Sequence, residues 1–203
     1  MSAELENRPI QERFQHLLTL IGSAHFLTRQ GLGNEVPFFI CPFKPDEAVE
    51  MGRIQRQLAN RLKQDGLRIL EINLYDVSIE LLQRRGIWSQ ILEMENTVSK
   101  DEIKELLQGV LDPESHLVPE IATRMNQAEF DVMFITGVGE VFPYIRSHNV
   151  LNNLQSTAKD KPTVMFFPGA YTQSLENGAS LDLFGRLHDD KYYRAFNIFH
   201  CEI

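Results

Sequence analysis

The sequence predicts an α/β protein built on a mainly parallel sheet that is flanked by helices. Three runs of consecutive apolar residues, at 38–41, 132–135 and 164–167, are typical of strands that are covered on both faces. Two other segments, 70–74 and 196–200, alternate apolar with polar residues and are typical of strands with a more exposed face. A helical pattern connects the first two strands, and strand, helix, strand units build parallel sheets with right-handed crossovers.

The helix expected between the first two strands covers 46–66. Acidic residues open this segment, which suits the positive end of a helix dipole, and Gly66 can supply the left-handed residue that ends it. The apolar residues of the segment recur at helical spacing and share one face: Met51, Ile54, Leu58 and Leu62. The segment therefore completes a strand, helix, strand unit.

The strand patterns also predict an order in the sheet. Numbered along the chain, the first, third and fourth strands belong in the middle, and the second and fifth belong at the edges. The order 5-1-4-3-2, which P-loop ATPase cores have, meets both conditions by fold-level analogy. The flavodoxin-like order 2-1-3-4-5 also places the second and fifth strands at the edges. We favour a five-stranded, degenerate P-loop-ATPase-like sheet with a helical insertion between its second and third strands.

The insertion, residues 76–130, is longer than a single crossover helix needs. Ser99 and Glu102 have the spacing of a capping box at a helix start. The predicted helices cover 76–85, 87–95, 100–108 and a last segment that ends near Asn126. Their apolar residues are either the docking face of an arm for another protein or the core of a small helical subdomain that packs on its own sheet. Periodicity does not distinguish these two interpretations.

Length and composition indicate one domain in the cytoplasm. With 203 residues, of which 43% are hydrophobic, the chain can bury one substantial core, so we expect a single domain over 1–203. No apolar run approaches the ~18 to 20 residues that a membrane helix requires, and the first residues are polar and acidic. Cys41 and Cys201 lie in or beside apolar strand-like runs, so we expect buried thiols rather than a disulfide.

The net charge of −8 is concentrated in the middle of the chain. Residues 76–131 contain 12 Asp or Glu and 5 Lys or Arg, a net charge of −7. Such a surface repels DNA phosphates, which disfavours direct nucleic-acid binding, and it attracts a basic protein surface.

The turns after the three central strands lack the groups that bind nucleotides. The turn PFKPD at 42–46 follows the first strand, whereas a phosphate loop needs glycines and a series of N–H donors that ends in Lys-Ser or Lys-Thr. Thr136 and Gly137 follow the third strand, where a magnesium-binding acid would be expected, and Pro168 and Gly169 follow the fourth. We therefore expect no ATP hydrolysis, no cofactor and no metal site.

The segment 131–156 contains a strand, a turn and a helix in the order that α/β nucleotide-binding proteins use. Gly137 and Gly139 break the strand, and a helix to Gln155 is expected after Pro143. The polar residues that we expect to face a partner or ligand here are Glu140, Tyr144, Arg146, His148, Asn149 and Asn152. Glu102 and Glu105 are the corresponding candidates in the acidic insertion. The alternative interpretation of the polar helix residues is a solvated helix face.

Five long runs of the chain resemble the BrxB family of bacterial BREX phage-exclusion gene clusters. These runs are GLGNEVPFFICP (31–42), LEINLYDVSIELL (70–82), LLQGVLDPESHLVPEI (106–121), FITGVGEVFPYIRSHNVLNNLQSTAKDKPTVMFFPGAYTQ (134–173) and LFGRLHDDKYYRAFNIF (183–199). The resemblance implies a small cytoplasmic component of an antiviral system that acts beside an ATPase, an adenine methyltransferase and the phosphatase-fold protein PglZ. It carries over no catalytic residues.

Two functional hypotheses follow from the residues and the resemblance together. The first is a non-catalytic adaptor that helps to assemble a BREX defence complex and binds PglZ through the acidic insertion and the polar helix. The second is a ligand- or nucleotide-binding sensor, or an enzyme, that uses the crevice at the carboxyl ends of the strands. In that case Glu140, Arg146, His148 and Asn149 are the nearby side chains.

Overall fold

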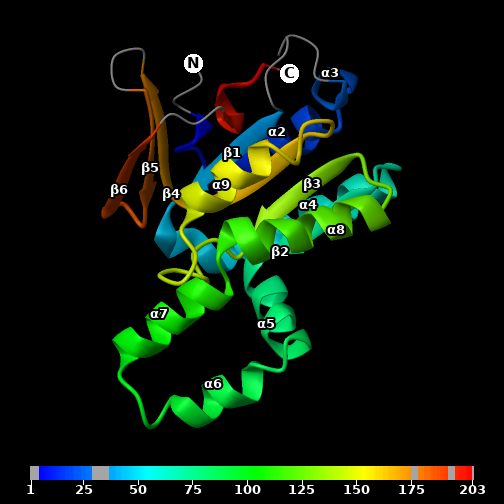
Figure 1. Ribbon diagram of the computed structural model, residues 1–203. Helices are drawn as coiled ribbons and strands as arrows, with labels where there is room; N and C mark the ends of the chain where they lie inside the picture. The colour runs from blue at the N-terminus through cyan, green and yellow to red at the C-terminus, as the bar shows by residue number, and fades with distance from the viewer. Residues whose placement is uncertain (1–4, 29–36, 175–177, 192–194, 203) are drawn as a thin grey trace.

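The computed structural model describes residues 5–28, 37–174, 178–191 and 195–202, which form a mixed α/β structure with a mostly parallel sheet flanked by helices (Figure 1). The hydrogen-bonded path through the sheet is β2-β3-β4-β1-β7. All four neighbouring pairs along this path are parallel. These strands are β1 (Phe38–Phe43), β2 (Ile69–Asn73), β3 (Val132–Thr136), β4 (Thr163–Ser174) and β7 (Phe196–Asn197).

The apolar runs of the sequence become the interior strands. All six residues of β1 are buried, and so are the first four residues of β3. Thr163 of β4 lies opposite Phe38 of β1 on one side and Met133 of β3 on the other, so β4 lies between them. Helices cover both faces of these strands, which explains why their side chains are apolar without alternation.

The sheet has seven strands, so the prediction of five was wrong. The strand β4 continues well beyond its apolar run and pairs antiparallel with β5 (Gly178–Leu183), which pairs in turn with β6 (Leu187–Lys191). Gly169 permits this extension, because a Cβ atom there would lie 2.0 Å from the carbonyl oxygen of Asp182 on β5. The added strands carry mixed sequences without a long apolar run, and their pairing depends on the close approach at Gly169.

The last strand is shorter than the alternating pattern at 196–200 predicts. Within this segment, only the two residues of β7 pair with β1. The 3-10 helix η3 (Ile198–His200) follows β7. The Asn197 side chain accepts a hydrogen bond of 3.1 Å from the backbone N–H of Phe199, and this local bond turns the chain out of the strand.

Helices α2 (Ile10–Ile21) and α4 (Ala48–Gln64) cover one face of the sheet. The predicted apolar face of α4 is buried, and the predicted left-handed residue Gly66 follows its end with a φ of +94°. Arg13 of α2 is 2% exposed and donates a 2.7 Å hydrogen bond to Glu47, just before α4. This buried ion pair fixes the position of α2 on α4.

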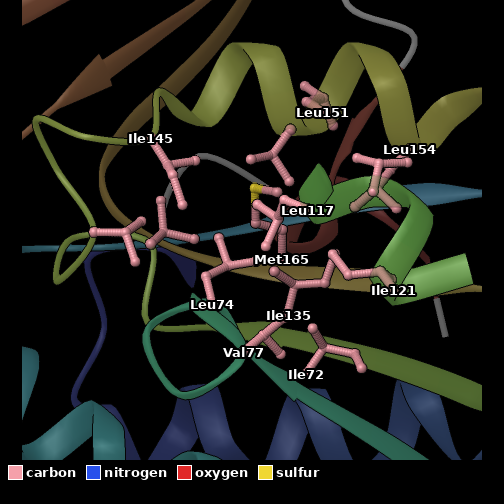
Figure 2. Close-up of a cluster of buried hydrophobic side chains, with 14 of the residues drawn as sticks. Ile72, Leu74, Val77, Leu117, Ile121, Ile135, Ile145, Leu151, Leu154 and Met165 are labelled. Atoms are coloured by element: carbon pink, nitrogen blue, oxygen red, sulfur yellow. The ribbon is translucent and has the colours of Figure 1, made fainter. Parts of the chain in front are cut away.

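Helices α8 (Val118–Gln127) and α9 (Ser147–Gln155) cover the opposite face. Figure 2 shows Leu151 and Leu154 of α9 pointing toward the strand residues Ile135 and Met165. Leu117, just before α8, completes this part of the core. The helix α9 begins three residues later than predicted, because Arg146 before it has an extended backbone with ψ of 130°.

Between β2 and β3 the chain forms the predicted series of helices. We call α5 (Leu74–Arg84), α6 (Trp88–Met94) and α7 (Lys100–Val110) the arm, because they extend away from the sheet (Figure 1). Ser99 and Glu102 form the predicted capping box at the start of α7. A short π-helix, Pro113–Leu117, then leads the chain back to α8 on the sheet. The insertion thus has one part that packs on the sheet and one that extends from it.

The two cysteines are free thiols. Cys41 is buried in β1, as predicted, and Cys201 is partly buried near the C-terminal end of the described chain. Burial raises the pKa of the Cys41 thiol above its ordinary value, and it raises the pKa of Cys201 to about 11. Both side chains are therefore protonated at neutral pH.

Candidate functional site

The crevice where β1, β3 and β4 end is small, whereas a separate cavity of about 480 Å³ lies beside the ends of β2 and β3. A cavity of about 200 Å³ lies where β1, β3 and β4 end. Ligand pockets for small organic molecules usually measure about 300–1,000 Å³. Most side chains that line the 200 Å³ cavity are apolar, and Glu140 is the one acidic or basic residue of its described lining.

Packing around two glycines explains why this crevice is nearly filled. A Cβ atom at Gly139 would lie 3.0 Å from Pro168 and 3.1 Å from the ring of Phe184, so β4 and the residue after β5 press against the turn after β3. The Phe184 ring also makes an edge-to-face contact with Phe142, at 6.1 Å between centroids. On the other side, a Cβ atom at Gly137 would lie 2.4 Å from the side-chain oxygen of Asn73. Side chains thus occupy the space that a ligand would need.

An acidic side chain lies where α/β nucleotide proteins bind phosphate, between the first strand and the next helix. One Glu47 oxygen accepts a 3.3 Å hydrogen bond from the backbone N–H of Lys44, and the other accepts the bond from Arg13. Pro45 supplies no N–H at this turn. The negative charge of Glu47 therefore lies near the helix start that would otherwise attract an anion.

The structure separates the six polar residues that the sequence places after β3. Glu140 is exposed and Tyr144 is partly buried, and both line a cavity of the arm. His148 is 6% exposed, and its place at a partner or ligand surface stays a prediction. It lies on the inner face of α9 with Leu151, three positions along the helix.

The remaining three polar residues of this segment do not converge on one point. Arg146 and Asn152 are exposed, and Asn149 is partly buried. The backbone carbonyl of Asn149 accepts a 2.8 Å hydrogen bond from the Asn153 side chain, so this pair is a local feature of the helix. Of the predicted residues within α9, Asn152 is therefore exposed and Asn149 is partly buried.

The helices of the arm line a cavity together with the turn after β3. A cavity of about 680 Å³ lies between α5, α6 and α7 and the turn after β3, and we call it the arm groove. Most of its lining is apolar: Tyr75, Ile79, Leu82, Trp88, Ile91, Leu92, Ile103, Leu107, Leu111, Val141 and Tyr144, with the polar residues Ser78, Glu95, Asn96, Lys100 and Glu140. The sequence identified an apolar surface in this insertion, but it contained no signal that three helices and the distant turn share one groove.

Two helices of the arm, α6 and α7, bury few of their own residues, whereas α5 buries five. Within α6 only Ile91 is buried, and within α7 only Leu107 is buried. Tyr75 and Leu92 are 45% and 47% exposed, although both side chains line the groove. The apolar faces that periodicity detected are therefore partly open to solvent.

Hydrogen bonds and ion pairs fix the base of the arm to α8 and to the turn after β3. Glu120 of α8 accepts from Arg84 of α5, and its neighbour Arg124 pairs with Glu80. These contacts, above all the hydrogen bond from Arg84, lower the pKa of the Glu120 carboxyl. Farther along the arm, Gln108 of α7 donates a 3.1 Å hydrogen bond to the carbonyl oxygen of Pro143. The arm is thus held in place by its base.

The acidic residues of the arm have different roles. Both the backbone N–H and the hydroxyl of Ser99 donate 2.8 Å hydrogen bonds to Glu102, which lowers the pKa of its carboxyl and stabilises the start of α7. Among the described residues, Glu95 and Glu105 are exposed and form no ion pair. Glu105 is therefore available to a partner, whereas Glu102 is already a helix cap.

Within the described ranges, no helix is long and apolar enough to cross a membrane. No group of three or more His, Cys, Asp or Glu side chains in those ranges is arranged to hold a metal ion.

Comparisons with known proteins identify the family. The family model described as "BREX protein BrxB" matches residues 70–198. A protein of that description from Bacillus cereus (strain H3081.97) is 39% identical over 94% of this chain and 98% of its own length. Another from Escherichia coli O9:H4 (strain HS) is 26% identical over 93% of this chain and 91% of its own length. No solved structure matches the chain, so its relation to P-loop ATPases stays a prediction. Because the matches extend over both the sheet and the arm, the chain belongs to the BrxB family of BREX proteins.

Proposed function

We propose that the protein is a non-catalytic cytoplasmic adaptor of a BREX phage-defence complex. In this proposal the chain is a single α/β domain, and the arm is the part that binds another component. The observation that carries the proposal is the arm groove, because its helices expose apolar side chains that a packed domain would ordinarily bury. Membership of the BrxB family supports the assignment to BREX.

PglZ is the partner that we propose first. The residues of the segment that contains the arm carry most of the negative charge of the chain, so the expected contact on the partner is basic. Tyr144 and Glu140 extend this surface from the arm to the turn after β3. We therefore keep Glu140 and Tyr144 as part of the proposed partner surface, together with the arm.

Two features of the fold support an adaptor over a nucleotide-using enzyme or sensor. Aromatic and proline side chains fill most of the crevice at the strand ends. Glu47 lies at the helix start where a phosphate would need positive potential. A clear rise in melting temperature on addition of ATP and magnesium would contradict the proposal.

Co-purification of the tagged protein with each other member of its gene cluster tests the proposal. We expect a stable complex with PglZ that survives washing. The double variant Glu95→Lys, Glu105→Lys should weaken this complex by about tenfold or more, because exposed charges at an interface act through attraction and association rate. Glu102 is left unchanged in this test, since its replacement would also remove the cap of α7.

The matched control is Glu50→Lys on α4, which is compared with the single arm variant Glu105→Lys because each reverses one charge. Glu50 is exposed and, like the two arm residues, forms no ion pair within the described chain. It should leave the complex unchanged. A complex that the arm variant and the control weaken equally would point to net charge rather than to the arm, and the absence of any complex would contradict the adaptor function itself.

A further inference from the structure

The arm groove has the size and lining of a site for protruding apolar side chains. Its volume is about 680 Å³, and its floor is made by buried side chains that include Leu82, Ile91 and Leu107. Its rim is more exposed, with Tyr75 and Leu92 close to half accessible. A partner that covered these side chains would remove apolar surface from water, which favours association.

The walls of the groove determine which backbone conformation can enter it. They are formed by helices α5, α6 and α7 and by the turn after β3, and helix interiors use their own N–H and C=O groups. An inserted extended strand would find no sheet edge there to satisfy its backbone groups. A helix satisfies its own backbone and presents apolar side chains on one face, as in other complexes in which a helix lies in a groove.

The charge at the groove determines the polar face of the incoming helix. Glu95, which follows α6, and Glu140, in the turn after β3, both line the groove, with Lys100 as the single basic residue of the lining. Glu105 is also exposed, on the helix α7 that contributes Ile103 to the groove. Opposite charges at the edge of an apolar contact favour the encounter and select against acidic partners. The complementary helix therefore carries Lys or Arg beside its apolar face.

We propose that the arm groove is the docking site for an amphipathic helix of the BREX partner, apolar on one face and basic along its flanks. This rests on the adaptor function and assigns the groove, rather than the exposed residues of α9, as the main contact. The partner helix places apolar residues three and four positions apart on the floor at Leu82, Ile91 and Leu107, with its basic residues beside Glu95 and Glu140.

A cross-linking experiment on the full complex identifies the occupant. Leu92 is replaced by the photoreactive residue p-benzoylphenylalanine in the tagged protein, which is then co-expressed with the whole gene cluster, irradiated and analysed by mass spectrometry. We expect cross-links to one helical segment of the partner, with apolar residues at helical spacing and neighbouring Lys or Arg. Val49, which is 75% exposed on α4, receives the same replacement as the control and should give no such cross-link.

Variants of the exposed rim supply a quantitative test. The double variant Tyr75→Ser, Leu92→Gln should raise the dissociation constant of the complex by about tenfold or more, because it removes two aromatic or aliphatic anchors. Val49→Gln should change it by less than about twofold. The melting temperatures of the variants are compared first, to show that each variant is folded. Tyr75, Leu92 and Val49 are exposed, so we expect no large change.

The outcomes distinguish the docking site from the adaptor function. If the unaltered protein binds its partner, but the rim variant binds equally well and position 92 gives no cross-link, the groove is not the site and the adaptor function stands. Cross-links from position 92 to a second copy of this chain, or to an acidic or extended segment, would also overturn the inference. If no partner co-purifies with the unaltered protein, both proposals fail.

Discussion

The sheet and the arm both contain apolar side chains but differ in how far they bury them. Every residue of β1 is buried, whereas α6 and α7 each bury one residue. The sheet is covered by helices on both faces, and aromatic rings fill the ends of its strands. The arm has its helices on one side and solvent on the other. An apolar segment therefore indicates function in this protein only where the fold leaves it uncovered.

The largest expected difference between the two regions is in stability. Phe134 of β3 is 1% exposed, and its ring meets Phe166 of β4 edge to face at 5.3 Å between centroids. Phe134→Ala should lower the free energy of unfolding by ~3–5 kcal/mol, because it removes apolar contacts and leaves a cavity. Urea unfolding measures the change. If this variant does not fold, Ile135→Val should still cost ~0.5–1.5 kcal/mol; a negligible cost for both would contradict the packed sheet.

The junction between the two regions should have an intermediate effect. Asn73 ends β2, and its side-chain oxygen accepts from the backbone N–H groups of Tyr75 (2.9 Å) and Asp76 (3.3 Å) at the start of α5. Asn73→Ala should cost ~1–2 kcal/mol through loss of this helix cap. Asn73→Asp, which keeps the acceptor, should restore most of the loss in the same unfolding experiment. Equal costs for both variants would indicate that the cap is not the cause.

An ion pair at the start of the sheet should produce a smaller, pH-dependent effect. The Arg68 side chain and backbone N–H donate to Asp131, and this lowers the pKa of the Asp131 carboxyl from 3.8 to about 2. Because the folded pKa is depressed, the contribution to stability is present above pH 4 and is lost as the pH falls toward 2. We expect about 1 kcal/mol, since Arg68 is half exposed and solvent screens the pair.

Unfolding experiments between pH 2 and pH 6 check this effect against the variant Asp131→Asn. The variant should be less stable than the unaltered protein at pH 6 and about equal to it near pH 2. Its stability should therefore fall less steeply as the pH decreases. The same pH dependence in both proteins would show that other carboxyl groups cause the acid sensitivity.

The smallest effect on stability is expected on the rim of the arm groove. Leu92→Ala should change the free energy of unfolding by less than about 0.5 kcal/mol, because the side chain is 47% exposed. Urea unfolding of Leu92→Ala and Phe134→Ala under the same conditions compares the two losses in free energy of unfolding directly. A cost above ~2 kcal/mol would mean that the arm buries Leu92 within its own fold in solution, and the contrast between the two regions would disappear.

Local patterns predicted most of the helices and the central strands, because each depends on residues close in sequence. The capping box at Ser99 and the apolar face of α4 are examples. The strands β5 and β6 were missed, since their pairing with the end of β4 depends on the close approach at Gly169. The pattern at 196–200 predicted a strand where the Asn197 side chain instead turns the chain.

The candidate site was predicted less well than the fold. Glu140 and Tyr144 line the arm groove, although the sequence placed them only beside a crevice or a polar helix. His148 is buried, which the sequence did not indicate, because helical spacing does not reveal which face of α9 meets the sheet. Glu102 lies in the predicted acidic insertion but serves as a cap.

The sequence by itself determined the class of the protein, the positions of its buried strands, the acidic insertion and the lack of a phosphate loop, because composition and short-range spacing are sufficient for these features. Only the tertiary structure decided that the strand ends are filled by Phe142, Phe184 and Pro168, and that the arm leaves a groove open. The physical reason is that burial depends on contacts between residues far apart in the chain, which periodicity alone does not specify.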